Sequence, residues 1–187
     1  KKFIEKLTGG EGSPLDQAVD QAQKMFEGGD TISASMVYNQ ILEADSFNAS
    51  AHAGMIKCLM ADDKNNEARD YLSGLTEDLL KNPLIKAAQT ALELAEQSAN
   101  TGDDDNLKVA LDADPNNHQI RYDYAIALYG GGKTEEAIEN LVDIIKLERT
   151  WNDDAARQQL FKIFEALGHG DPITVEGRRK LSVVLFA

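Results

Sequence analysis

The sequence predicts an all-α protein, built as a solenoid of helical hairpins with capping helices at its C-terminal end. Three observations support this class. Amphipathic helical patterns recur in pairs, glycines or polar residues separate the two patterns of a pair, and small and large apolar residues return at the same places of a 34-residue unit. A single hairpin cannot bury its own apolar stripe, so neighbouring copies are expected to stack against one another.

The clearest unit covers residues 118–151, with Gly132 between its two helical patterns. Its eighth, eleventh, twentieth, twenty-fourth and twenty-seventh places are held by Ala125, Leu128, Ala137, Leu141 and Ile144. Small residues allow two antiparallel helices to approach closely, large ones fill the seam, and glycine permits the sharp turn. This is the pattern of the tetratricopeptide repeat.

Three further units precede it, at residues 15–48, 49–82 and 84–117. Ala34 and Ala68 hold the twentieth place in the first two, 34 residues apart. The large seam residues recur as well, at Met25, Tyr38, Ile41, Leu59, Leu72 and Leu75. The third unit is degenerate, because Asp103 stands at its twentieth place and its second helix is short. Together the units predict a repeat domain over residues 14–151.

A separate N-terminal part is expected over residues 1–13. Phe3, Ile4 and Leu7 share one helical face, as in a terminal helix that packs on another body. The stretch TGGEGS follows and is typical of a flexible linker, because glycine and small polar residues retain high backbone entropy. This part is predicted to be the end of a preceding domain plus a Gly-rich linker.

Two C-terminal helices are expected over residues 152–187. The first ends at Leu167 and is expected to begin at a cap near Asn152 or Asp153. Its inward residues are predicted to be Leu160, Phe161, Phe164 and Leu167. The second helix follows the break GHGDP and is unusually apolar for a chain end. It either caps the solenoid or binds a partner.

Composition limits the possible partners and the compartment. The net charge of −13 argues against a nucleic-acid backbone or an anionic membrane surface, because both would repel the chain. The 187 residues include one cysteine, so an intramolecular disulfide is impossible and a reducing, cytoplasmic location is expected. We find neither a signal peptide nor a long apolar run that would cross a membrane.

Enzyme signatures are missing from the sequence, and we expect no catalytic residues, no metal and no cofactor. The three histidines stand far apart, and no nucleophile or dinucleotide motif is present. Two weak alternatives remain. The acidic cluster at 102–106 resembles a calcium loop, which needs glycine at the sixth place and a bidentate acid at the twelfth, but counting from Asp103 these places hold Lys108 and Asp114. The stretch GGGKT at 130–134 resembles a phosphate loop but sits at a repeat turn without a preceding strand.

Cys58 lies in the first helix of the second unit, next to the seam residue Leu59. Free cysteine commonly behaves as a small, buried apolar residue. The functional alternative is a reactive thiol that forms mixed disulfides under oxidative stress.

The concave face of such a solenoid is built mainly from the first helix of each hairpin. Its side chains here are mostly apolar, which suits an amphipathic helix or an exposed apolar client segment. The predicted client-groove residues are Val19, Phe26, Met60, Leu92, Tyr122, Ile126 and Tyr129. The equally weighted alternative is that the chain's own C-terminal helix fills this groove.

Two stretches resemble a known family. KKFIEKL with its Gly-rich linker resembles the close of a thioredoxin domain, and the ending GDPITVEGRRKLSVVLFA is similar to the C-terminal region of bacterial thioredoxin/tetratricopeptide-repeat co-chaperones called chaperedoxins. The resemblance covers nearly the whole chain, and its most specific part is DP-x-T-x-x-G-R-R-K-L-S. The thioredoxin body itself is absent from this sequence, and Cys58 matches no thioredoxin active-site position.

The resemblance implies an ATP-independent holdase that binds unfolded protein clients during stress. It passes them to a GroEL-type chaperonin or to the Hsp70 system, in the bacterial cytoplasm. Docking on the chaperonin is implied for the C-terminal helix, whose candidate residues are Val175, Arg178, Arg179, Leu181, Val184, Leu185 and Phe186.

Two other functions stay open. The chain could serve as an adaptor for one dedicated folded partner, without affinity for unfolded chains. It could also be the positioning arm of a thioredoxin-type oxidoreductase, in which case redox activity would reside in a domain that precedes Lys1.

Overall fold

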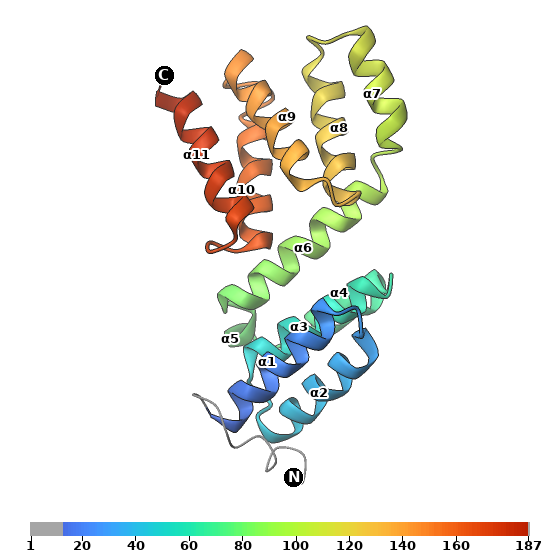
Figure 1. Cartoon of the computed structure of the whole chain (residues 1–187), viewed down its shortest axis with the longest axis vertical. Helices are drawn as coiled ribbons and strands as arrows, with labels where there is room; N and C mark the ends of the chain where they lie inside the picture. The colour runs from blue at the N-terminus through green and yellow to red at the C-terminus, as the bar shows by residue number, and fades with distance from the viewer. Residues whose placement is uncertain (1–12, 187) are drawn as a thin grey trace. The chain divides into compact units, whose positions relative to one another are not determined.

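The structure, a computed structural model, describes residues 13–186, and every regular element in that range is an α-helix. The predicted all-α class is therefore confirmed. The helices are α1 Pro14–Glu27, α2 Thr31–Ala44, α3 Ala49–Ala61, α4 Asn65–Ser73, α5 Glu77–Leu80, α6 Pro83–Ala99, α7 Asp104–Ala113, α8 His118–Gly130, α9 Thr134–Leu147, α10 Ala155–Leu167 and α11 Pro172–Phe186 (Figure 1). Apart from Ser13, the predicted N-terminal helix and linker at 1–13 lie outside the described residues.

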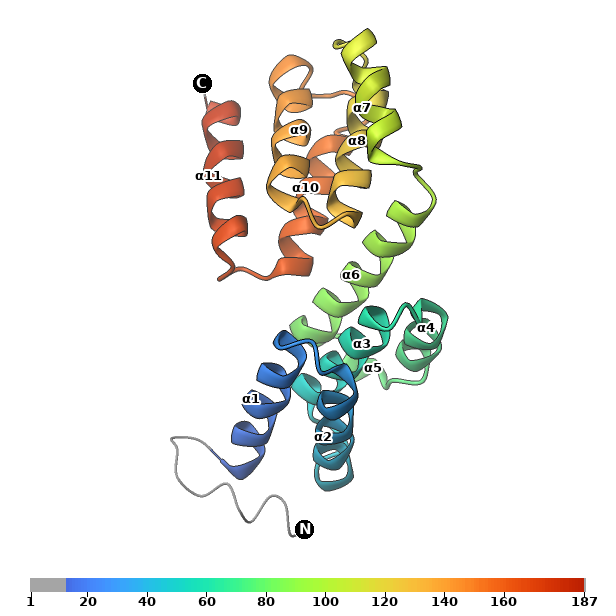
Figure 2. The ribbon, with the colours of Figure 1, turned by 45° about the vertical axis from the view of Figure 1, so that its right-hand side comes forward.

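The chain divides into two compact units, Lys1–Gln89 and Thr90–Ala187, and the boundary falls inside α6. In the first unit α1 packs on α2, α2 on α3, and α3 on α4. In the second unit α9 packs against α8, α10 and α11. Figure 2 shows α8, α9, α10 and α11 of the second unit as neighbouring helices.

The alanines at the twentieth place form the seam of each regular hairpin. Ala34, Ala68 and Ala137 are all completely buried. A methyl group at this place lets the two helices of a hairpin approach closely, whereas a larger side chain would hold them apart. The repeat register expected from the sequence is thus present in α1–α2, α3–α4 and α8–α9.

The three regular hairpins also share one turn geometry. Gly29, Asp63 and Gly132 occupy the fifteenth place of their units and have φ angles of 84°, 59° and 77°. The next N–H in each turn bonds back to the helix, as in the 2.8 Å bond from Lys133 to the Leu128 carbonyl. This is a Schellman ending, and it requires a left-handed residue that is usually glycine.

Short polar side chains begin the helices. Ser13 and Asp16 form a reciprocal capping box at the start of α1. Asp30 accepts a hydrogen bond from the Ser33 N–H at the start of α2. Such caps satisfy main-chain donors that have no partner inside the helix.

The third predicted hairpin departs from the others. Across the described range, α7 packs along α8 and has no comparable contact with α6. Asp103, which stands where the other units have a seam alanine, is the exposed N-cap of α7 and accepts from the Asp105 N–H. A carboxylate cannot fill a tight apolar seam, so α6 is left free to pack elsewhere.

The region before α10 also differs from the prediction. The helix begins at Ala155 with Asp154 as its N-cap, one residue after the predicted cap position Asp153, and Asn152, Asp153 and Asp154 all adopt left-handed φ angles of 45° to 65°. Asn and Asp favour both helix N-caps and left-handed turns, so the residue types alone do not distinguish the two. Phe161, which was predicted to face inward, is 52% exposed, whereas Leu160 and Phe164 are buried.

Candidate protein-binding surfaces

The predicted client-groove residues of the first unit are Val19, Phe26 and Met60. All three are half-buried. Val19 and Phe26 of α1 pack against the core cluster that includes Ala22, while Met60 lies near the end of α3. Each therefore keeps an accessible part that could contact a partner.

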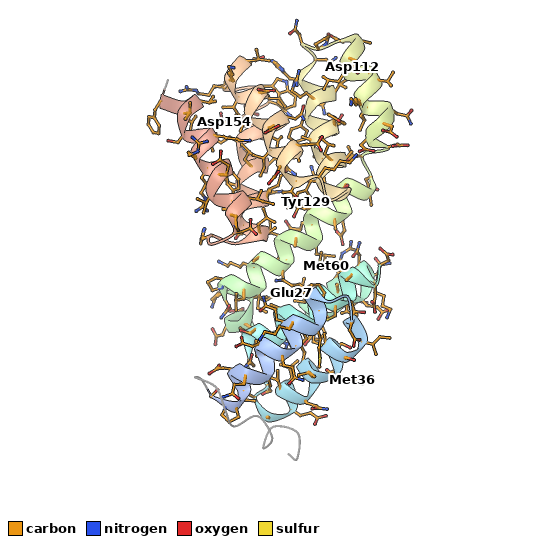
Figure 3. All side chains as sticks on the ribbon, in the orientation of Figure 1. Glu27, Met36, Met60, Asp112, Tyr129 and Asp154 are labelled. Atoms are coloured by element: carbon orange, nitrogen blue, oxygen red, sulfur yellow. The ribbon has the colours of Figure 1, made fainter. Side chains whose placement is uncertain are left out.

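The predicted groove residues of the second unit are less accessible. Leu92 and Ile126 are 3% and 4% exposed, so their side chains belong to the interior. Tyr122 and Tyr129 are half-buried and pack against the main core cluster of this unit. Figure 3 shows Tyr129 at the end of α8 that approaches α6. The face predicted to receive clients is thus largely covered in this structure.

Residues 90–99 of α6 provide that cover, through two polar connections to α10. The Thr90 hydroxyl donates to Glu165 over 3.2 Å. The side-chain amide of Gln159 donates to Gln97 over 3.0 Å and accepts from the Tyr122 hydroxyl over 3.3 Å. Burial raises the pKa of Tyr122, so its hydroxyl remains protonated and able to donate.

A close contact between backbone and side chain completes the packing of α6 on α8. Gly130 has no side chain, and Ser98 occupies the space that a Cβ atom at residue 130 would need. Leu94, 1% exposed, enters the same core cluster as Leu160 and Phe164 of α10. The predicted alternative, that the C-terminal helix fills the groove, does not hold for the second unit, because α11 packs on α9 and α10 and the segment that contacts α8 and α10 at this face is the C-terminal part of α6.

The C-terminal helix α11 packs instead against α9 and α10. Of its seven predicted docking residues, Leu181 is buried in the core cluster and cannot reach a partner. Val184 and Leu185 are half-buried, and the remaining four are exposed: Val175, Arg178, Arg179 and Phe186. The helix therefore keeps an accessible face, although the prediction mixed inward and outward positions.

A surface groove of about 450 Å³ runs between α9 and α11. Its apolar lining includes Val142 and Val183, and its charged lining includes Lys146, Arg179, and the ion pair of Lys180 with Glu139 at 2.6 Å. The hydrogen bond that Lys180 donates to Glu139 raises the pKa of Lys180, which remains charged. Asp143 also lines the groove, and Arg179 pairs with Glu176 at 2.6 Å, so the groove combines apolar surface with charges of both signs.

Cys58 lies in α3, where only 3% of its surface is exposed. Burial, followed by the charge of Asp62, raises its pKa to about 11. Since the thiolate is the reactive species, such a thiol is almost entirely unreactive at neutral pH. The geometry therefore supports the interpretation of Cys58 as a small core residue.

The two weak motifs at the turns meet each other in the fold. Asp103, Asp104 and Asp105 place ligand atoms within 4.8 Å of one another, and Asp104 pairs with Lys133 of the GGGKT turn at 2.7 Å. The hydrogen bond from Lys133 lowers the pKa of Asp104. This ion pair joins α7 to the α8–α9 turn, which gives both motifs a structural role.

Sequence reasoning missed two relevant residues. Gln159 is 4% exposed and links three helices, but a glutamine on an amphipathic helix gives no sign of burial. Val183 is 61% exposed on α11, and it stands four residues after Arg179 on the same helical face. A helical-wheel count from Val175 could have found it.

In the range 13–186 no helix is both long and apolar enough to span a membrane. Residues 97–186 match the tetratricopeptide repeat family. That match includes α10 and α11, so the C-terminal helices resemble a further repeat hairpin.

Two individual proteins are similar to this chain. An uncharacterized protein of Haemophilus influenzae is 31% identical over 98 residues, which are 52% of this chain and 45% of that protein. The chain thus spans less than half the length of this relative. A crystallised domain of unknown function from Vibrio parahaemolyticus is 24% identical, with a TM-score of 0.44, over 91% of this chain and 99% of that domain. The family match and the burial of Ala137 support a tetratricopeptide-repeat-like region at residues 97–186, and repeats of this kind are typical of protein–protein interaction.

Proposed function

We propose that this chain is the protein-binding part of a bacterial, cytoplasmic co-chaperone of the chaperedoxin type. It holds non-native protein clients and passes them to a GroEL-type chaperonin, with the Hsp70 system as a further acceptor. Its role is binding and not catalysis. On the same resemblance, residues 1–13 are assigned to the end of a thioredoxin-like domain and its linker, and any redox activity belongs to that domain.

The observation that carries the proposal is the exposed face of α11. Val175, Val183 and Phe186 are 58%, 61% and 86% exposed. Their spacing of eight and three residues places them on one side of the helix, with Arg179 between them. We call Val175, Arg179, Val183 and Phe186 the α11 face.

Exposed apolar side chains at such spacing mark a surface that another protein covers. Arg179 lies within the α11 face, and Lys146 lies in the groove beside it. Arg179 pairs with Glu176, and Asp143 lies in the same groove, so this position favours a partner whose apolar contact surface is bordered by charges of both signs. Leu181 anchors the opposite side of the helix in the core, so the α11 face can be changed without loss of the fold.

Chaperonin docking is tested with Val175→Ser and Val183→Ser in one variant. The matched control is Val109→Ser on α7, where the valine is 71% exposed. We expect the double variant to lose at least about tenfold in affinity for purified chaperonin in a co-elution or interferometry assay, while the control binds like wild type. Equal binding of the double variant and wild type would rule out docking through the α11 face.

Client holding is tested separately, by suppression of the heat-induced aggregation of a model enzyme. Phe26→Gln removes an accessible apolar side chain of the first unit, and Phe47→Gln changes an exposed phenylalanine outside the predicted groove. We expect the first variant to suppress aggregation less well and the second to match wild type, with folding of both checked by circular dichroism. If wild type itself gives no suppression, the holdase role is wrong.

One observation favours the adaptor for a single folded partner as a second candidate. Residues 90–99 contact α8 and α10 of the second unit, and Leu92 and Ile126 are buried there, so fewer of the predicted groove residues are accessible in the second unit than in the first. An adaptor would need the α11 face alone. Two results together would select this candidate. A pull-down would recover one stoichiometric folded partner that the α11 double variant no longer binds, and wild type would not suppress aggregation.

A further inference from the structure

The face of the second unit that is covered by α6 has the properties of a helix-binding site with a ligand already in place. We define it by four residues, Tyr122 and Gly130 of α8 with Gln159 and Glu165 of α10, and call it the α8–α10 face. Its occupant is residues 90–99, here called the resident segment. Each member of the face is connected to that segment by a hydrogen bond, by a bridging side chain or by close packing.

The resident segment uses one stripe of its helix for these contacts. Thr90, Leu94, Gln97 and Ser98 are spaced by four, three and one residues, which places them along one side of an α-helix. Each offers different chemistry: a hydroxyl to Glu165, an apolar side chain to the core cluster, an amide to Gln159, and a small side chain to Gly130. The connection is therefore a set of complementary contacts at regular helical spacing.

The contacts of the resident segment with α8 and α10 are few, but they select for particular side chains. The Gln159 side chain is buried, and its amide would lose the Gln97 acceptor if the resident segment left. Another helix could replace that acceptor only by presenting a similar group at the same place. The packing at Gly130 likewise admits only a small residue at the place of Ser98.

The repeat architecture gives a reason why this helix can leave. In the range 13–186, α6 has no extended packing against α7, its expected hairpin partner. It is joined to α7 by residues 100–103, which include Gly102 with a φ angle of 100°. The contacts that hold the resident segment are therefore the hydrogen bonds to Glu165 and Gln159, the burial of Leu94 and the packing of Ser98 on Gly130, and not a hairpin seam with α7.

We propose that the α8–α10 face is an exchangeable helix-binding site, held closed by the resident segment and entered by partner helices that present the same pattern. The partner is an amphipathic helix with a leucine, an amide side chain three residues later and a small residue next to it. This inference rests on the proposed function, since the entering helices are segments of the clients. A partner helix binds only those molecules in which the face is open, so its apparent affinity is the intrinsic affinity multiplied by the open fraction.

Gly130 provides the means to open the site. In Gly130→Ala the new methyl group occupies the position of the Ser98 side chain, so the resident segment must move away. The matched control is Gly131→Ala, whose methyl group would lie at an ordinary 3.5 Å from the Ala127 carbonyl. The double variant Gly130→Ala/Ser98→Gly returns the lost space and should restore closure, with Ser98→Gly alone as its reference.

The first readout is hydrogen exchange. We expect amide exchange in residues 90–99 to be faster in Gly130→Ala than in wild type. In Gly131→Ala and in Gly130→Ala/Ser98→Gly the exchange rates should equal those of wild type. Unchanged exchange in Gly130→Ala would overturn the inference, because the segment would then not be held by this contact. If Gly130→Ala does not fold, Gln159→Ala serves as the second opening variant, since it removes the bridge between Gln97 and Tyr122.

The second readout is binding of a labelled synthetic peptide with the sequence of residues 90–101. We expect Gly130→Ala to bind this peptide at least about tenfold more tightly than wild type does. A peptide carrying Leu94→Asp should bind to neither protein. Equal affinity of the opened variant and wild type for the native peptide would overturn the inference. This readout does not depend on any chaperone activity.

The aggregation assay then separates the two proposals. Stronger suppression by Gly130→Ala than by wild type and Gly131→Ala supports exchange with clients. If wild type suppresses aggregation and the opened variant is no better, the inference fails and the proposed function stands. If no variant suppresses aggregation, the proposed function fails, and the peptide result alone decides whether the face accepts helices.

Discussion

Arg149, in the loop between α9 and α10, donates a hydrogen bond from its guanidinium to the main-chain carbonyl of Val184 in the last turn of α11. The distance is 3.1 Å, and a second bond of 3.2 Å reaches the carbonyl of Leu185. The last carbonyls of a helix have no partner within the helix, and a cation near them also interacts favourably with the helix dipole. A side chain from another loop thus caps the helix that carries the proposed docking face.

We expect Arg149→Ala to loosen the C-terminal turn of α11. Because the residue is exposed, the loss in unfolding free energy should be about 0.5–1 kcal/mol. The clearer effect is local, namely faster amide exchange in residues 181–186. Lys162→Ala on α10 is the control, since it removes an exposed cation from another helix. Wild-type exchange in Arg149→Ala would show that the two hydrogen bonds do not hold the turn.

The three regular hairpins have Gly29, Asp63 and Gly132 at the fifteenth place of the unit, so the second hairpin has aspartate where the other two have glycine. The Asp63 φ of 59° is left-handed, which costs about 1 kcal/mol for a residue with a Cβ atom. We expect Asp63→Gly to raise the unfolding free energy by up to about 1 kcal/mol, and Gly29→Ala or Gly132→Ala to lower it by a similar amount. Urea denaturation of the three variants measures these changes. An equal loss in all three would mean that the Asp63 side chain stabilises the turn.

The repeat seam and its turns could be predicted from the sequence because they depend on local spacing. Ala34, Ala68 and Ala137 recur at one place of the unit, and their burial follows from that place alone. The same logic failed for Leu181, because a helical pattern does not say which of its faces a neighbouring helix covers. An apolar residue therefore fits a docking face and a core equally well.

The position of α6 could not be predicted, for a different reason. The third unit has the length of a hairpin, so α6 was expected to pair with the helix that follows it. The contacts of Gln97 with Gln159 and of Ser98 with Gly130 join residues that are distant in sequence. Polar and small residues of this kind carry no periodic signal, and only their tertiary neighbours give them meaning.

The stability of the first unit should fall at alkaline pH. Burial raises the pKa of Cys58 to about 11 and that of Tyr38 to about 12. In the unfolded chain these groups titrate near 8.5 and 10, so the folded protein binds their protons more tightly. Their contribution to stability is complete below about pH 8.5 and is lost as the pH rises through about 11 and 12.

The measurement is the urea midpoint of unfolding at several pH values between 7 and 11. We expect a decline above about pH 8.5 that is shallower in Cys58→Ala than in wild type, because the variant lacks the first of the two titrations. The variant is compared with itself at pH 7, which removes the effect of the lost sulfur on packing. Parallel curves for the two proteins would assign the decline to other groups.

Gly54 in α3 lies directly beneath the ring of Tyr38 in α2, which occupies the space that a Cβ atom would need. Intrinsic helix propensity favours alanine over glycine by about 0.5–1 kcal/mol, but overpacking of a core costs about 1–3 kcal/mol. We therefore expect Gly54→Ala to lower the unfolding free energy, although the helix propensity of alanine alone would raise it. Gly74→Ala is the control, because its methyl group would lie 3.5 Å from the nearest atom.

The cause is isolated by a double-mutant cycle with Tyr38→Leu, which shortens the side chain that covers Gly54. If the ring is the obstacle, Gly54→Ala should cost less in the Tyr38→Leu background than in wild type, with a coupling of about 1 kcal/mol or more. Additive effects would mean that the strain comes from elsewhere in α3. Because both residues face the core of the first unit, neither the α11 face nor the α8–α10 face should change its binding in these variants.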